Sequence, residues 1–76
     1  MSAVAVDALA QQALARGLAH DLRNALLVIR GYSAVLKPGL RDAEQLHDVE
    51  EIEKATDRAA ELTDELLAQV RLYAAD

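Results

Sequence analysis

The sequence predicts an all-α protein: two long helices that form an antiparallel hairpin, which homodimerises into a four-helix bundle. Three observations predict this class. Alanine and leucine supply sixteen and thirteen of the 76 residues, and both are strong helix formers. Phenylalanine and tryptophan are absent, and the chain has only one proline and three glycines. Apolar residues recur at steps of three and four, which is the spacing of one helix face.

The first helix is expected over about residues 3–36. Lys37-Pro38-Gly39 ends it, because proline cannot continue a helix and glycine suits a turn. The apolar row of this helix consists of Val6, Ala10, Ala13 or Leu14, Leu18, Leu22, Ala25 or Leu26, Ile29, Ser33 and Leu36.

A turn over residues 37–41 leads to the second helix, expected over about residues 42–74. Asp42, with Gln45 three residues later, has the form of an N-cap and capping box. The apolar row of this helix consists of Leu46, Val49, Ile52, Thr56, Ala59, Leu62, Leu66, Val70 and Tyr73.

Both rows are wider than one partner helix can cover. The positions that widen them are Leu9, Leu27, Ala60, Leu67 and Leu72. Burial of apolar surface is favourable by about 25 cal/mol per Å², so a second copy of the chain is the natural partner for this surface. Two helices barely form a core, whereas four from two chains form a bundle. We therefore predict a homodimer.

Size and composition narrow the classes of function. Seventy-six residues allow one small domain, 1–76, and the absence of cysteine excludes disulfides and thiolate metal sites. Residues 1–40 carry four basic and two acidic side chains, and residues 41–76 carry four basic and eleven acidic ones, for a net charge of −5. This acidic balance argues against a nucleic-acid partner. No apolar run approaches the roughly 20 residues needed to span a bilayer, and no signal peptide is evident, so we expect a cytoplasmic chain without direct membrane contact.

A polar group on the first helix is the candidate site. His20 carries a nucleophilic imidazole, Asp21 beside it can accept or orient a ring proton, and Asn24 lies one turn further along. The Asn24 amide could hold a water for attack on a phosphoryl group. The alternative is that all three are ordinary solvated residues of a helix surface, which is the commoner role for a lone histidine on an amphipathic helix.

The remaining candidates are weaker. Arg23 and Arg30 could meet an anionic partner or phosphate, or simply cover the helix surface. His47 has no comparable neighbours, and we interpret it as a surface histidine. The histidine spacing favours no metal site, and the isolated glycines form no phosphate-binding loop, so we expect no metal or cofactor in this chain.

The segment from His20 to Tyr32 closely resembles the H-box of two-component sensor histidine kinases. The residues that carry this resemblance are His20-Asp21-Leu22-Arg23-Asn24, Leu26, Ile29, Gly31 and Tyr32. The segment from Asp57 through Arg71 resembles the closing part of the dimerisation and histidine phosphotransfer domain of these kinases. The resemblance spans about residues 14–73.

The resemblance implies a role for each site residue. His20 would be the phosphoacceptor, Asp21 would assist its phosphorylation, and Asn24 would support dephosphorylation of a partner receiver domain. The implied fold is the helical hairpin dimer that the periodicity predicts independently. Members of the family often have proline five residues after the histidine, where this chain has Ala25, so no proline-dependent bend is inferred here.

The resemblance also implies partners. ATP and Mg²⁺ would be bound by the family's ATP-binding catalytic domain, which this chain lacks, and His20 would pass its phosphoryl group to an aspartate of a response-regulator receiver domain. We expect the chain to be a fragment of a longer protein-histidine kinase, whose remainder can include a membrane anchor. Two alternatives stay open: a stand-alone histidine phosphotransfer protein, and a purely structural helical dimerisation module.

Overall fold

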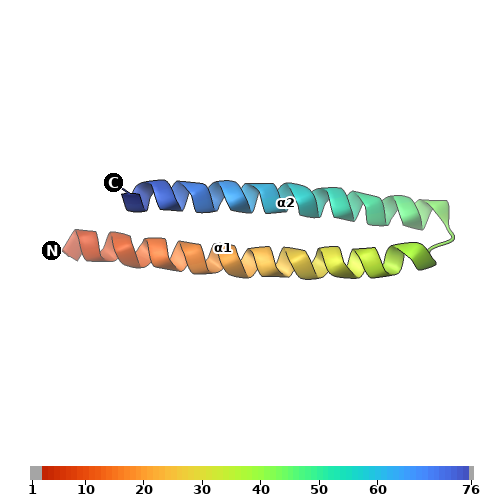
Figure 1. The fold of residues 1–76 in the computed structure, drawn as a ribbon, viewed down its shortest axis with the longest axis horizontal. Coiled ribbons are helices and arrows are strands. Elements are labelled where there is room, and N and C mark those ends of the chain that lie inside the picture. The colour runs from red at the N-terminus through yellow and green to blue at the C-terminus, as the bar shows by residue number, and fades with distance from the viewer. Residues whose placement is uncertain (1–2, 76) are drawn as a thin grey trace.

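A computed structural model describes the backbone of residues 3–75 and the side chains of residues 7–70. Helix α1 spans Ala3–Leu36, a short 3₁₀ turn spans Lys37–Gly39, and helix α2 spans Ala43–Ala75. The two helices lie side by side and antiparallel in a rod of 61 × 15 × 13 Å (Figure 1). No strand occurs among the described residues. The predicted all-α hairpin is confirmed.

The hairpin turn is closed by local hydrogen bonds. The Leu40 backbone N–H donates to the Lys37 carbonyl oxygen over 3.2 Å. Asp42 precedes α2 as its N-cap, because its Oδ1 accepts hydrogen bonds from the backbone N–H groups of Glu44 and Gln45, at 2.8 and 3.0 Å. Helix α1 runs without a break through Ala25.

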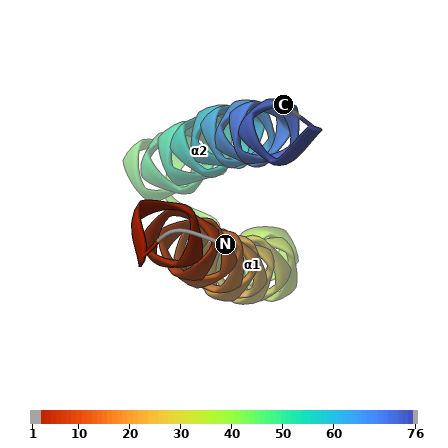
Figure 2. The same cartoon turned by 90° about the vertical axis from the view of Figure 1, so that its left-hand side faces the viewer.

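Small and hydroxylated residues dominate the contact between α1 and α2. The buried positions are Ala19, Leu26 and Ser33 on α1 and Thr56, Thr63, Leu67 and Val70 on α2. Along α1 they recur at steps of seven. Along α2, Thr56, Thr63 and Val70 also recur at steps of seven, and Leu67 divides the last step into four and three. This is the spacing of a supercoiled helix pair. The end view agrees, since the two helices cross rather than lie strictly parallel (Figure 2).

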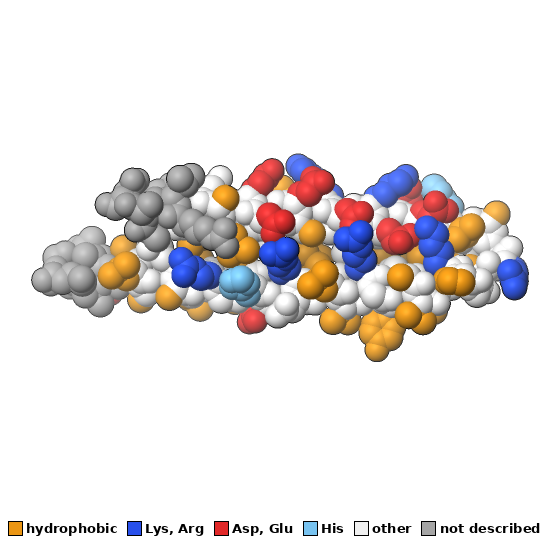
Figure 3. Space-filling view, viewed as in Figure 1, with side chains coloured by type: hydrophobic (Ala, Val, Ile, Leu, Met, Phe, Trp, Pro, Cys, Tyr) orange, Lys and Arg blue, Asp and Glu red, His pale blue; other side chains and the backbone are white. Residues whose placement is uncertain are grey.

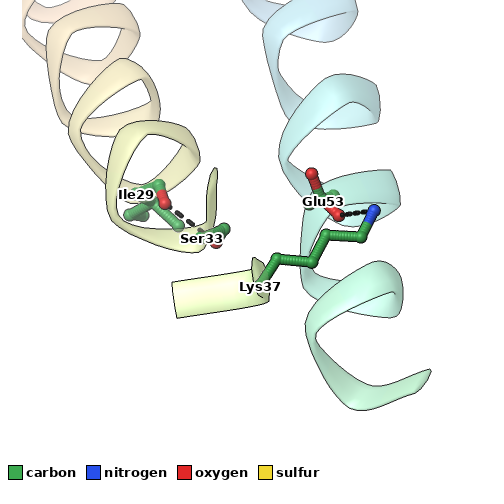
Figure 4. A network of polar contacts seen from close by, with 4 residues as sticks. All are labelled: Ile29, Ser33, Lys37 and Glu53. Atoms are coloured by element: carbon green, nitrogen blue, oxygen red, sulfur yellow. Dashed lines mark hydrogen bonds and ion pairs between the residues drawn. The ribbon is translucent and has the colours of Figure 1, made fainter. Parts of the chain in front are cut away.

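The buried hydroxyl groups are all hydrogen-bonded within their own helix. Ser33 Oγ donates to the Ile29 carbonyl oxygen over 2.9 Å (Figure 4), and the two buried threonines donate to the carbonyls four residues before them, each over 2.8 Å. No buried side-chain polar atom lacks a partner among the described residues. Burial of these groups therefore leaves no unsatisfied donor, and the helices can approach closely.

Large aliphatic side chains lie along one edge of the helix pair, outside this contact. We call this surface the apolar edge; it consists of Leu18, Leu22, Ile29 and Leu36 on α1 and Ile52, Leu62 and Leu66 on α2, all 44–60% exposed. The single apolar row expected on each helix therefore separates into two. Leu67, expected beside the main row of α2, is in fact only 4% exposed and packs inside the hairpin.

Three ion pairs join the helices along the opposite edge, which we call the charged edge. They link Arg23 to Asp64 over 3.5 Å, Arg30 to Asp57 over 3.4 Å, and Lys37 to Glu53 over 3.0 Å. Figure 3 shows the row of basic side chains on α1 beside acidic side chains on α2, and Figure 4 shows the last pair in close-up. Ion pairs between two packed helices influence their orientation, so this arrangement favours the observed antiparallel register.

Candidate functional site

The three residues singled out in the sequence lie near the middle of α1, and all three are exposed. His20, Asp21 and Asn24 are not hydrogen-bonded or ion-paired to any described side chain. The helix alone sets their relation, because it advances about 100° and about 1.5 Å per residue. His20 and Asn24 therefore point the same way one turn apart, whereas Asp21 points about 100° away from His20.

The position of His20 around the helix separates it from the apolar edge. Leu22 is two residues on and therefore points about 200° away from His20, to the opposite side of α1. Arg23, three residues on, points within about 60° of the histidine and belongs to the charged edge. The imidazole is therefore beside the charged edge, where a second macromolecule can reach it without displacing apolar contacts.

Basic residues on both sides of His20 form part of a row that sequence reasoning missed. Arg16, Arg23 and Arg30 follow one another at a strict step of seven on α1, and Lys37, the first residue of the 3₁₀ turn, continues the step. Acidic residues follow the same step on α2 at Glu50, Asp57 and Asp64. The sequence contains the signal as two charge rows of equal period, whereas Arg23 and Arg30 were interpreted only as separate residues. Figure 3 shows a histidine within the basic row.

Two concave surfaces lie on the hairpin-turn side of His20. The first is a groove between the helices, with Leu26, Thr56 and Ala60 in its floor and the Arg23–Asp64 and Arg30–Asp57 pairs at its rims. The second is a shallow depression on the outer face of α1, lined by Val28, Gly31, Tyr32 and Val35. Tyr32 is 69% exposed there, so its ring is available for contact with another molecule.

His47 lies in different surroundings near the start of α2. It is exposed, and its neighbours at helical spacing are acidic: Glu44, Glu50 and Glu51. Of these, Glu51 has its pKa lowered from its ordinary value, mainly by a hydrogen bond from Lys54. The interpretation of His47 as an ordinary surface histidine stays a prediction. Nothing in the geometry gives His47 a group of polar neighbours like that around His20.

Two further observations concern the molecule as a whole. Among the described residues, no three histidine, aspartate or glutamate side chains are grouped so that they could hold a metal ion. Over the same residues, neither helix has an apolar stretch sufficient to cross a bilayer.

Comparison with known proteins adds one finding to this geometry. Residues 10–74 match the family described as the His Kinase A (phospho-acceptor) domain. No curated protein and no solved structure matches the chain. The family match covers most of both helices, including His20, its basic neighbours and the hairpin turn. The chain therefore belongs to the His Kinase A (phospho-acceptor) domain family.

Proposed function

We propose that His20 is the phosphoacceptor of this domain and that it passes the phosphoryl group to a response regulator. Domains of this family serve phosphoacceptance and dimerisation in histidine kinases. The observation that carries the assignment is the position of His20: it is exposed at mid-helix beside a row of basic side chains, within the matched residues. His47 is the other histidine within the match, and its neighbours are acidic, which disfavours an incoming phosphate.

The chemistry consists of two transfers. A ring nitrogen of His20 attacks the γ-phosphorus of ATP presented by a separate catalytic domain, the bond to the β,γ-bridging oxygen breaks, ADP leaves, and the other ring nitrogen releases its proton. An aspartate carboxylate of a receiver domain then attacks the phosphorus, the P–N bond breaks, and the imidazole recovers its proton. Mg²⁺ and ATP belong to the catalytic domain. This chain contributes the nucleophile, His20, and the helix that holds it exposed to both partner domains.

Asp21 and Asn24 receive separate roles in this proposal. Asp21 points away from the imidazole, so it would hold the proton of the second ring nitrogen through a bridging water rather than directly. Asn24 points the same way as His20, one turn on, and would orient a water against the acyl phosphate of the docked receiver domain. Its amide can both donate to and accept from such a water.

The apolar edge is the surface for the second protomer. Its seven aliphatic side chains are half exposed in the single chain, and they lie on the side of the hairpin away from His20. Pairing this edge with its copy buries large apolar groups at about 25 cal/mol per Å² and leaves the histidine accessible. The same geometry supports the predicted homodimeric four-helix bundle.

The outer depression on α1 suits the receiver domain. Val28 begins it about 12 Å along the helix from His20, at ~1.5 Å per residue. A domain that seats on Val28, Tyr32 and Val35 can therefore bring a carboxylate to the imidazole. An exposed aromatic residue between two β-branched residues is a typical anchor of a protein–protein contact.

A pair of matched histidine variants tests the assignment. The chain is incubated with ATP and the catalytic domain of its own system, and acid-labile, base-stable label is counted. His20→Gln should abolish the label and His47→Gln should retain it, while both keep the helical signal and the dimer mass of the unchanged chain. Label that survives in His20→Gln contradicts the proposal. Absence of label in every variant supports the structural dimerisation module instead.

A further inference from the structure

Arg16 differs from the three other members of the basic row, which runs along α1 into the 3₁₀ turn. Arg23, Arg30 and Lys37 each pair with a carboxylate of α2, at 3.5, 3.4 and 3.0 Å. Among the side chains of residues 7–70, Arg16 has no such ion pair. The register explains why. Asp64 is the last member of the acidic row on α2. The next position of that row, seven residues later, would correspond to Arg16 in the antiparallel register, and the sequence has an arginine there.

Arg16 lies one helical turn before His20 and points within about 40° of it. Side chains four residues apart on a helix have their Cβ atoms about 5–6 Å apart. Both residues are exposed, and neither forms an ion pair or side-chain hydrogen bond among the described residues. A guanidinium on its long stem can therefore reach a group attached to either ring nitrogen of His20.

A phosphoryl group on the imidazole changes the charge at this place. Such a group carries about two negative charges near neutral pH and presents three acceptor oxygens. The nearest carboxylate in the sequence is Asp21, and on α2 Asp64 already holds Arg23. A planar guanidinium is the side chain best suited to phosphate oxygens, because it donates two parallel hydrogen bonds.

We propose that Arg16 binds the phosphoryl group of phosphorylated His20, whereas Arg23 remains with Asp64. Arg16 thereby neutralises the charge that appears on phosphorylation and holds the group for transfer. The meaning of this contact in signalling rests on the proposed function. The contact itself is a property of the phosphorylated side chain and can be measured without any kinase.

Chemical phosphorylation provides the test. Potassium phosphoramidate phosphorylates imidazole: a ring nitrogen attacks phosphorus, the P–N bond to the leaving nitrogen breaks, and ammonia departs. All variants carry His47→Gln, so that His20 is the one acceptor. The second pKa of the phosphoryl group is then followed by ³¹P NMR, because a bound cation favours the dianion and lowers this pKa.

Arg16→Gln should raise this phosphoryl pKa by about 0.2–0.7 unit, the range expected for an exposed pair worth ~0.2–1 kcal/mol. Arg16→Lys should restore most of the shift, because the charge is kept. Two matched controls are Arg23→Gln, three residues after His20 but ion-paired, and Arg30→Gln, more than two turns away. Arg23→Gln should give the smaller shift, and Arg30→Gln none.

Two outcomes overturn the inference: an equal phosphoryl pKa with and without Arg16, or a larger shift from Arg23→Gln than from Arg16→Gln. The second would mean that phosphorylation draws Arg23 away from Asp64. Neither outcome bears on kinase-dependent labelling of His20→Gln, so failure of this inference and failure of the proposed function are distinguishable. Circular dichroism of each variant shows whether the helix is unchanged.

Discussion

The charged edge and the apolar edge border the same helix contact but have opposite chemistry. Along the charged edge, each described pair of facing side chains joins a cation to a carboxylate, and the members of the pairs are 29–62% exposed. Along the apolar edge, seven aliphatic side chains are 44–60% exposed among the described residues. Similar exposure therefore has different consequences at the two edges.

Exposed ion pairs contribute little free energy, about 0–1 kcal/mol each, so the charged edge selects register and orientation more than it adds stability. Exposed apolar surface is a driving force that the isolated hairpin leaves unused. We infer a division of labour: the apolar edge assembles the protein, and the charged edge presents His20. Substitutions at one edge should then spare the function of the other, which can be tested.

The largest effect is expected from a charge on the apolar edge. Leu66→Glu should abolish the dimer, because a buried, unpaired carboxylate costs several kcal/mol at a desolvated interface. Sedimentation equilibrium measures the mass, and the unchanged chain should melt at a temperature that rises with protein concentration. Leu27→Glu is the matched control, since Leu27 is 57% exposed on the His20 side of α1 and should keep the dimer. A concentration-independent melting temperature for the unchanged chain would contradict the division.

The next effect separates Asp21 from Asn24 on the accessible side of α1. Asp21→Asn should slow phosphorylation of His20 by about 10²-fold, the usual contribution of positioned acid–base help. Asn24→Ala should leave that rate unchanged and slow only dephosphorylation of the receiver domain. Both rates are measured on each variant with the intact kinase and its regulator. Equal loss of both rates in both variants would show that the residues act as one contact surface, and the separate roles would be wrong.

A smaller effect should follow from reversal of one ion pair. Arg30→Glu should lower the free energy of unfolding by up to about 1 kcal/mol, because it places two carboxylates together where Asp57 had a partner at 3.4 Å. Adding Asp57→Arg restores an opposite pair and should recover most of the loss. Denaturant titrations of the four proteins give the coupling, which should shrink in 1 M salt. No recovery in the double variant would mean that the pair does not help to set the register.

The smallest effect is a pH dependence at the end of the charged edge. The pKa of Lys37 is raised above its ordinary value of 10.5, first by its hydrogen bond to Glu53 and then by the charge of that residue. A raised lysine pKa stabilises the fold below pH 10.5, and this contribution is lost as the pH rises through the raised value. The difference in melting temperature between the unchanged chain and Lys37→Gln should therefore shrink above about pH 10.5. A constant difference from pH 7 to 11.5 would contradict this assignment.

The acid side offers a matched control for the same measurement. The pKa of Glu51 is lowered by Lys54, so that pair stabilises the fold above the ordinary glutamate value of 4.5 and is lost as the pH falls. Lys54→Gln should alter the acid limb of the stability curve and leave the alkaline limb unchanged. Lys37→Gln should change the alkaline limb.

Most of the fold could be predicted from the sequence because the signals are local. Alanine and leucine content, the step of three and four, and Lys37-Pro38-Gly39 predict two helices and a turn, and Asp42 predicts the cap that the structure contains. The geometry of the candidate site could also be predicted from the sequence, because the spacing of His20 and Asn24 on a helix determines the relative direction of their side chains. The roles of these residues stay predictions.

The sequence by itself determined the helices, the turn and the family, because helix propensity, capping and motif spelling act over a few residues. Only the tertiary structure decided which apolar positions face the neighbouring helix. Thr56 and Thr63 are buried while Leu62 and Leu66 stay outside, because each threonine hydroxyl bonds to its own helix and its small volume lets α1 approach. Hydrophobicity alone ranks these residues the other way. The inner face of a helix pair depends on the fit of two surfaces, and that fit is not a property of either helix alone.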